Sequence, residues 1–324
     1  MTGRLEAIES RTRKIEEATS LQEMMSSMQE LQRELAKQNA KHNPAASKEI
    51  VKKLQADGFP MFQIDSAGNI SISARSSHSQ TRVKNSAEGV DVSSFQDRID
   101  WGKARHEVDF AMIKASEGST IADAKFASNW DNTTKAGVMR GAYHFFRPKT
   151  DVQEQVQNFC APFKHHYNGD LPPALDLEDA HLWKGMSQKQ KIKEINEWMK
   201  GVEHELHVQP IIYTNTNFYQ KVLKNTAELK KYPLWIADWR DRSTPEIPKP
   251  WQGQGKEYLF WQYDAFGKIP GVSGRVDCDY YKGTMAELRN IIIEQRKIAA
   301  GDEAAVGHLP APRHRHPDKR NGHE

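Results

Sequence analysis

Hydrophobic and polar residues follow a helical period in the first part of the chain. Residues 4 to 42 contain no Gly or Pro, and their apolar positions recur at alternating spacings of three and four. That spacing places the apolar side chains on one face of a helix. Two clean heptads are fewer than the three or four that identify a coiled coil, so self-association and packing of a lone amphipathic helix on another surface both stay open. The positions of this apolar stripe are Leu21, Met24, Met28, Leu31 and Leu35.

The period changes to that of a β-strand after a short second helix that is expected to end at Gly58. Phe62 and Ile64, and then Ile70 and Ile72, alternate with polar residues on either side of a Ser-Ala-Gly-Asn turn. Alternation around such a turn is typical of a β-hairpin. The first part of the chain is therefore predicted to contain a helical or coiled-coil segment at 1–58, a hairpin at 59–75 and a polar linker at 76–87.

A regular succession of short β-rich runs and longer segments begins at Val90. Eight such runs occur, and the gaps between them are long enough for helices until Trp239, after which they carry Pro and Gly instead. This order predicts an α/β fold, an irregular TIM-like (β/α) barrel at 88–300 that a helix at 284–299 closes. The Pro-, His- and Arg-rich remainder at 301–324 is expected to be a disordered tail. The eight runs are 90–95, 110–116, 140–146, 174–178, 210–214, 234–239, 260–263 and 276–281.

Composition and charge narrow the classes of function. The 324 residues carry a formal net charge of +3, and Lys and Arg are interleaved with Asp and Glu, so no basic surface for nucleic acid is indicated. No stretch approaches the roughly 18 apolar residues of a membrane span, and the N-terminus lacks the basic and apolar regions of a signal peptide. Cys160 and Cys278 have no metal or redox spacing, so reduced thiols in a protein made in the cytoplasm are expected.

The most informative positions are two carboxylates, Asp176 and Glu178, in an apolar run that follows two prolines. Residues two apart on a strand share one face, so both carboxylates would project the same way. Each would have to be desolvated, and each would raise the pKa of the other. One protonated and one ionised carboxyl group are what glycosidic bond hydrolysis needs. The alternative is a strand end whose acids cap a helix or pair with Arg or Lys.

Further acids, amides and aromatic residues occur in or just after the other predicted strands. Active sites of barrels lie at the carboxyl ends of the strands, and a saccharide site needs flat aromatic faces, polar partners for hydroxyls and a carboxyl pair. Each residue alone has a structural explanation, but the set supplies all three requirements. Its members are Asp91, Glu117, Tyr143, His144, Tyr213, Asn215, Asp238, Trp239, Trp261, Gln262, Tyr263, Asp277 and Asp279.

These runs also resemble glycoside hydrolase family 25, the Chalaropsis-type lysozymes, which are N-acetylmuramidases. The resemblance covers residues 88 to about 284, and it says nothing about residues 1–85 or the tail. The motifs that carry it, in family order, are GVDVSSFQ at 89–96, IKASEG at 113–118, GAYHF at 141–145, LDLE at 175–178, IYTN at 212–215, LWIA at 234–237, WQY at 261–263 and VD at 276–277.

The resemblance implies Glu178 as the general acid, with Asp176, Asp91 and Asp277 as an acidic floor around it. It implies a sugar or acetamido contact for Tyr143. Two positions depart from the family pattern: Asp279 stands where Asn is usual, and Trp239 stands where Tyr is common. If the last strand is regular, Asp277 and Asp279 share a face, so the substitution is not expected to be silent.

The expected reaction is hydrolysis of the β-1,4 bond between N-acetylmuramic acid and N-acetylglucosamine in peptidoglycan, with no cofactor and no metal. The resemblance favours retention, with the substrate's acetamido group as the nucleophile and Asp176 orienting it; direct attack by an aspartate is the alternative. A different class of function is a glycan-binding module with lost or secondary catalysis. The route to the wall is also open between a phage lysin and an effector of an injection machine, with residues 1–85 docking onto the partner.

Overall fold

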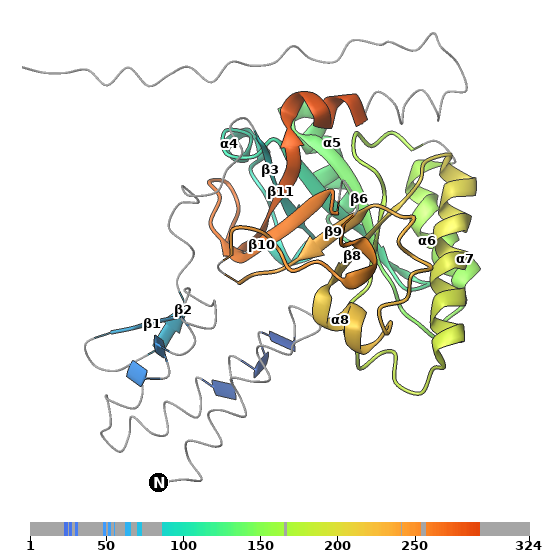
Figure 1. The fold of residues 1–324 in the computed structure, drawn as a ribbon. Helices are drawn as coiled ribbons and strands as arrows, with labels where there is room; N and C mark the ends of the chain where they lie inside the picture. The colour runs from blue at the N-terminus through green and yellow to red at the C-terminus, as the bar shows by residue number, and fades with distance from the viewer. Residues whose placement is uncertain are drawn as a thin grey trace, which may run out of the picture.

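The structure is a computed structural model that describes residues 86–164, 167–240, 242–253 and 257–291, together with separate residues between 23 and 72 (Figure 1). The predicted tail at 301–324 and the second half of the closing helix lie outside the described residues. So does most of the predicted linker, although the first strand of the barrel already begins at Ser86, inside that segment.

Eight strands form a closed barrel in the order β3-β11-β10-β9-β8-β7-β6-β4, and β4 pairs back to β3. All eight predicted runs are strands, but β7 ends at Asp176, so Glu178 follows the strand rather than belonging to it. β11 is antiparallel to both of its neighbours, whereas the other pairs within the ring are parallel. The strands are β3 (Ser86–Val92), β4 (Phe110–Glu117), β6 (Met139–Phe145), β7 (Ala174–Asp176), β8 (Ile211–Asn215), β9 (Leu234–Ala237), β10 (Phe260–Gly267) and β11 (Val276–Thr284), with a short β5 (Ile121–Ala122) antiparallel to β4.

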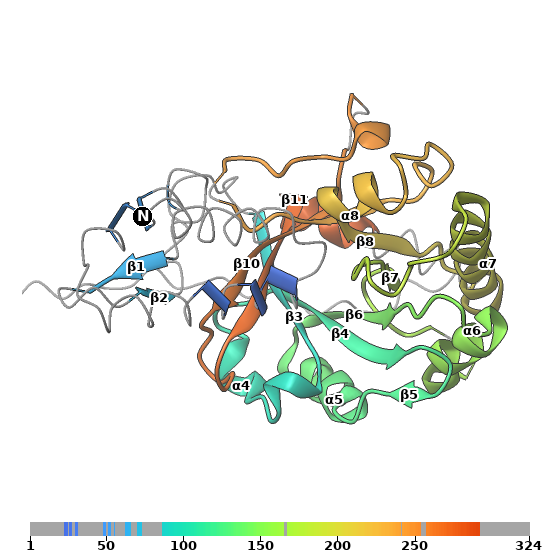
Figure 2. The same cartoon turned by 90° about the horizontal axis from the view of Figure 1, so that it is seen from below.

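Helices cover the outside of the first half of the barrel (Figure 2). The longest, α7, begins after Ser187, whose hydroxyl accepts from the backbone of Gln190 in a reciprocal capping box. In the two connections that join β9, β10 and β11, η3 is the only helical element among the described residues, which agrees with the Pro and Gly in those gaps. The helices are α4 (Trp101–Ala104), α5 (Phe126–Ala136), α6 (Val152–Cys160), α7 (Gln188–Leu206) and α8 (Thr216–Lys221), with 3-10 turns η1 (Ser94–Gln96), η2 (Ala161–Phe163) and η3 (Lys249–Trp251).

Strand alternation divides the barrel into an outer and an inner hydrophobic cluster. Val90 and Val92 of β3 pack outward against the helices, whereas Gly89 and Asp91 lie between them in the alternation and face inward. Aromatic rings fill one level of the interior, with the Phe110 and Phe260 ring centroids 5.2 Å apart. An added Cβ at Gly89 would lie 2.3 Å from the Phe110 ring, so only glycine fits there.

The described residues of the N-terminal part include a hairpin and helical positions near the barrel. β1 (Phe62–Ile64) and β2 (Ile70–Ile72) pair antiparallel, as the alternation predicted. The helical residues between 23 and 31 lie beneath the barrel in Figure 1 and in front of it in Figure 2. Met24 and Leu31 are at most 1% exposed and belong to the same hydrophobic cluster as the side chains of the barrel interior.

A polar contact adds to this packing, because Glu23 Oε1 lies 3.2 Å from His181 Nε2, in the segment that follows β7. Two positions of the predicted apolar stripe are therefore covered within one chain, without a second copy. The stripe positions Leu21, Met28 and Leu35 lie outside the described residues. No helix in the described part of the chain combines the length and the apolar character that crossing a membrane requires.

Candidate active site

Five acidic residues converge inside one end of the barrel. Asp91 comes from β3, Asp176 from the end of β7, and Asp277 and Asp279 from β11, while Glu178 follows β7 by two residues. Asp277 lies opposite Asp91 in the β3–β11 pairing. Val276 and Cys278 of β11 pack in the outer cluster. Because side chains alternate along a strand, Asp277 and Asp279 share the inner face, as the alternation predicted.

A chain of hydrogen bonds holds Asp91. Its Oδ2 accepts from Gln262 Nε2 at 2.6 Å. Gln262 Oε1 in turn accepts from the Tyr213 hydroxyl at 3.0 Å and from Trp239 Nε1 at 2.8 Å. Because two donors fix the carbonyl oxygen of Gln262, its amide group has to point at Asp91. Asp91, Gln262, Tyr213 and Trp239, all predicted from the sequence, thus form one connected set.

Asp279 belongs to the same set through Asp91 and through Trp235. The Asp91 and Asp279 carboxyl groups are hydrogen-bond partners. Trp235 Nε1 donates to Asp279 Oδ1 at 2.7 Å. The Asp279 side chain is fully buried. Trp235 was not among the predicted site residues. Side chains alternate along β9, so Trp235 lies on the inner face with Ala237, whereas Ile236 between them faces outward.

The chain around Asp176 and Glu178 is fixed by its backbone. Phe146 N donates to Asp176 O at 3.1 Å, and Leu177 N donates to Tyr213 O at 2.9 Å. The next residue after Glu178, Asp179, has a φ of 58°, in the left-handed region that Asp tolerates better than most residues. The chain therefore turns away directly after Glu178, two residues beyond the end of β7, leaving this carboxyl group at the end of the barrel.

The acids strongly perturb one another. Burial raises the pKa of Asp91 from 3.8 to about 6, against hydrogen bonds from Gln262 and Asp279 that lower it. Burial also raises the pKa of Asp176 well above its ordinary value, and the charge of Glu178 raises it further, whereas Lys114 lowers it. The pKa of Asp277 is raised by burial and then by Asp91 and Glu178. Such a group of acids retains protons near neutral pH, as acid–base catalysis on a glycoside requires.

Two tyrosines line the same space. The Tyr143 ring centroid lies 6.2 Å from that of Trp235, and the Tyr213 centroid lies 4.6 Å from it. Burial, and then the negative charge of Asp91 and Asp176, raises the pKa of the Tyr143 hydroxyl. Tyr143 therefore remains a neutral hydrogen-bond donor beside the acids, and its predicted place in the site agrees with this geometry.

Trp261 and Tyr263 lie elsewhere. Both belong to the outer cluster, on the opposite face of β10 from Gln262. Trp261 Nε1 donates to Asp238 O at 2.8 Å. The structure does not bring these two aromatic side chains to the acids, so they are not retained as sugar contacts.

His144, Asn215 and Asp238 have structural surroundings as well. His144 faces outward, stacked on Trp198 at 5.4 Å, and burial lowers its pKa to about 4. Asn215 caps α8, its side chain accepting from Phe218 N at 2.9 Å. Asp238 Oδ1 accepts from Arg240 Nε at 2.6 Å. His144 and Asp238 lie on the outward faces of their strands, whereas Asn215 continues the inward series of Ile211 and Tyr213 at the end of β8.

Glu117 acts as an anchor for two cations. Lys114 Nζ lies 2.7 Å from Glu117 Oε2, and Arg147 binds the other oxygen. Partial burial raises the pKa of Glu117, but the two ion pairs together lower it by more, so the pKa lies below its ordinary value. Lys114 and Arg147 both stack on the ring of Phe145. Lys114 is a missed site residue: it lies in the IKASEG motif, and its charge reaches Asp176.

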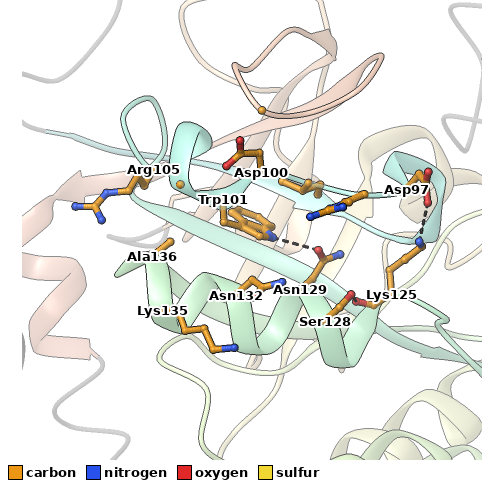
Figure 3. Close-up of a pocket in the computed structure, with 14 residues that line it drawn as sticks. Asp97, Asp100, Trp101, Arg105, Lys125, Ser128, Asn129, Asn132, Lys135 and Ala136 are labelled. Atoms are coloured by element: carbon orange, nitrogen blue, oxygen red, sulfur yellow. Dashed lines mark hydrogen bonds and ion pairs between the residues drawn. The ribbon is translucent and has the colours of Figure 1, made fainter.

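A separate surface pocket of about 810 Å³ lies between α4 and α5 (Figure 3). Trp101 Nε1 donates to Asn129 Oδ1 at 3.1 Å in its wall, and Lys125 Nζ lies 2.6 Å from Asp97 Oδ1. The Gly271 backbone, from the loop before β11, closes one side. None of the acids inside the barrel lines this pocket, so the candidate active site is the acidic cluster.

Comparisons with known proteins identify the family of this chain. The model of glycosyl hydrolases family 25 matches residues 90–272, more than half of the chain. Lysozyme M1 of Streptomyces globisporus is 32% identical over 209 residues, which cover 62% of this chain and 69% of that protein. The N,O-diacetylmuramidase of Chalaropsis is 27% identical over 210 residues, covering 59% of this chain and 95% of that protein.

Among solved structures, the bacterial lysozyme from Streptomyces coelicolor has a TM-score of 0.57 at 30% sequence identity, covering 64% of this chain and 98% of that chain. The family model begins at residue 90, so it does not cover the N-terminal part of this chain. Because the family model covers residues that supply every strand of the barrel except β11, the chain belongs to glycosyl hydrolases family 25 and is a glycoside hydrolase.

Proposed function

We propose that this protein is a muramidase that hydrolyses the β-1,4 bond between N-acetylmuramic acid and N-acetylglucosamine in peptidoglycan. The observation that supports this best is the pair Asp176 and Glu178 at the end of β7, beside Asp91, Asp277 and Asp279 on the inner face of the barrel. Relatives named lysozyme and N,O-diacetylmuramidase support the same substrate class. A module that only binds glycans would not need so many buried acids, since each costs desolvation energy.

In the proposed reaction Glu178 is the general acid. It transfers its proton to the glycosidic oxygen while the bond from that oxygen to the anomeric carbon breaks. The oxygen of the substrate's acetamido group attacks the anomeric carbon from the other face, and Asp176 accepts the acetamido N–H and orients it. Water then opens the cyclic intermediate, with Glu178 taking the proton of the water, so the anomeric configuration is retained. Direct attack by an aspartate is the alternative to this scheme.

The remaining residues of the connected set bind and orient. Tyr143 and Tyr213, both held neutral, offer hydroxyl groups beside the acids. Asp91 and Asp277 add negative charge that favours the positive charge developing on the sugar ring in the transition state. Lys114 offsets part of this charge and keeps Asp176 closer to ionisation than burial alone would allow.

The biological route is proposed to be either a phage lysin or an effector of an injection machine that brings the enzyme to the cell wall. Residues 1–85 lie outside the family match, which supports a role separate from hydrolysis. Their described helical positions contact the barrel, so release of this contact would be part of such a role.

The test of the proposed activity is the isosteric substitution Glu178→Gln in the full chain. An amide cannot donate the proton, so the release of reducing ends from purified peptidoglycan should fall by a factor of about 10²–10⁴. The matched control is Glu197→Gln on α7, whose partly exposed carboxylate pairs with Lys193 and which should leave the rate unchanged. If Glu178→Gln keeps more than half of the wild-type turnover, the assignment of the acid is wrong.

A further inference from the structure

We propose that Asp279 is a positioning residue of this active site, a neutral carboxylic acid that donates a hydrogen bond from Oδ2 to Asp91 and so holds the Asp91 carboxylate in place. The proposal rests on the proposed function only for its catalytic consequence, since the protonation of Asp279 can be measured independently of activity.

The first step is that the two carboxyl groups need a proton between them. Asp279 lies opposite Gly89 in the β3–β11 pairing, next to the pair formed by Asp277 and Asp91, and its side chain is fully buried. Asp279 Oδ2 is buried and receives no N–H or O–H from the described residues. Its partner is the Asp91 carboxyl group. Two ionised carboxylates in this contact would repel each other in a buried site, so one of them is protonated.

The second step is that the proton belongs on Asp279. Asp91 already receives the amide N–H of Gln262 at 2.6 Å, and Gln262 cannot turn because Tyr213 and Trp239 donate to its carbonyl oxygen. A fixed donor aimed at Asp91 stabilises the charge on that group. Asp279 receives one donor, Trp235 Nε1, on Oδ1.

The other titratable groups around Asp279 act in the same direction. Asp277 on the same strand and Asp91 on β3 are both acids, and they disfavour a further negative charge. Burial raises the pKa of Asp279 well above its ordinary value, and Asp91 raises it further, whereas the pKa of Asp91 reaches only about 6. As the pH rises, Asp91 therefore loses its proton first and Asp279 keeps its own.

The third step is that the two oxygens of Asp279 have different roles. Oδ1 accepts from Trp235, as a carbonyl oxygen does, which leaves Oδ2, buried and without a donor among the described residues, to carry the proton donated to Asp91. An asparagine has the same shape, with an acceptor at Oδ1 and a donor at Nδ2. The neutral-acid role thus predicts that asparagine can replace Asp279, whereas a role as a charged group in the reaction predicts that it cannot.

The experiment compares Asp279→Asn and Asp279→Ala in the full chain, by kcat/KM for the release of reducing ends from purified peptidoglycan at pH 5 to 7. Asp279→Asn should keep activity within about threefold of the wild type. Asp279→Ala should lose about 10- to 100-fold, the worth of a hydrogen bond to a charged group. Equal losses in the two variants would overturn the proposal, because they would mean that the carboxylate itself is needed. Full activity of a folded Asp279→Ala would also overturn it, because nothing would then depend on the bond to Asp91.

A second readout does not depend on activity and covers a poorly folding Asp279→Ala. The infrared difference spectrum between wild type and Asp279→Asn at pH 7 should contain the C=O stretch of a protonated carboxylic acid, present only in the wild type. A carboxylate band in its place would refute the neutral state of Asp279. If the protein does not hydrolyse peptidoglycan but the acid band is present, the proposed function fails while the protonation of Asp279 stands.

Discussion

Replacing the buried acid Asp91 with Asn should stabilise the fold at neutral pH while it impairs catalysis. Asp91 is 7% exposed, and burial raises its pKa from 3.8 to about 6. The native state therefore binds this proton more strongly than the unfolded chain does. Since the native state holds more protons, the free energy of unfolding is largest below pH 3.8 and falls as the pH rises to about 6.

The magnitude follows from the pKa values. A rise from 3.8 to about 6, at about 1.36 kcal/mol for each pKa unit, means that ionised Asp91 costs the wild type about 3 kcal/mol above pH 6. Asparagine has no such cost, but it cannot accept from both Gln262 and Asp279, and one lost hydrogen bond costs about 1 kcal/mol. The net effect of Asp91→Asn should be a gain of about 2 kcal/mol at pH 7.5 and a loss of about 1 kcal/mol at pH 4.

Urea unfolding of the full chain at pH 4 and pH 7.5, followed by tryptophan fluorescence, measures both values. Asp131→Asn is the matched control, because it makes the same chemical change at an exposed position of α5 and should alter the unfolding free energy equally at both pH values. A variant Asp91→Asn that is less stable than the wild type at pH 7.5 would refute the reasoning. It would show that the bonds from Gln262 and Asp279 outweigh the desolvation of the carboxylate.

Two further predictions concern the N-terminal part of the chain. Met24→Asp places a charge at a position that is 1% exposed, so it should detach the helix from the end of the barrel and raise the rate on purified peptidoglycan. Ser26→Asp, at an exposed position of the same helix, should leave the rate unchanged. If Met24→Asp instead lowers both the rate and the melting temperature, the helix supports the fold. A polypeptide of residues 86–300 contains all eight strands, so it should hydrolyse peptidoglycan alone and give the circular dichroism spectrum of a folded protein. Aggregation of this polypeptide would mean that Met24 and Leu31 are needed to cover the barrel.

The strands were predictable because each is a short β-rich run between turn residues, and this local pattern holds in the barrel. The direction of β11 was not predictable from these runs, because the predicted runs 260–263 and 276–281 leave 12 residues between them, enough for a parallel crossover, whereas β10 in fact extends to Gly267. Only residues 268–275 separate β10 from β11, and a parallel crossover needs a dozen residues or more. A short connection of this kind joins antiparallel neighbours. The antiparallel pairing of β11 with β10 follows directly from that length.

The structure brings predicted site residues to the acidic cluster where strand alternation was respected and places others elsewhere where it was not. Trp261, Gln262 and Tyr263 are consecutive, so they cannot all face the acids. Gln262 faces inward because it continues the inward series that begins at Phe260, and its two neighbours therefore face outward. Trp235 and Lys114 were missed because their partners, Asp279 and Asp176, are distant in the sequence and only the closed barrel brings them together.

The order of inward-facing residues along each strand connects the fold to the site. In the parallel strands the small or apolar residue comes first and the polar one follows, as in Ala174 and Asp176 of β7 or Phe260 and Gln262 of β10. In β11 the order is reversed, because the acids come first and Tyr281 comes last, opposite Phe260. An antiparallel strand has to reverse the order to put its acids at the same end of the barrel. The reversal is therefore a sequence signature of strand direction, and the same constraint gathers the acids on one level above the packed aromatic rings.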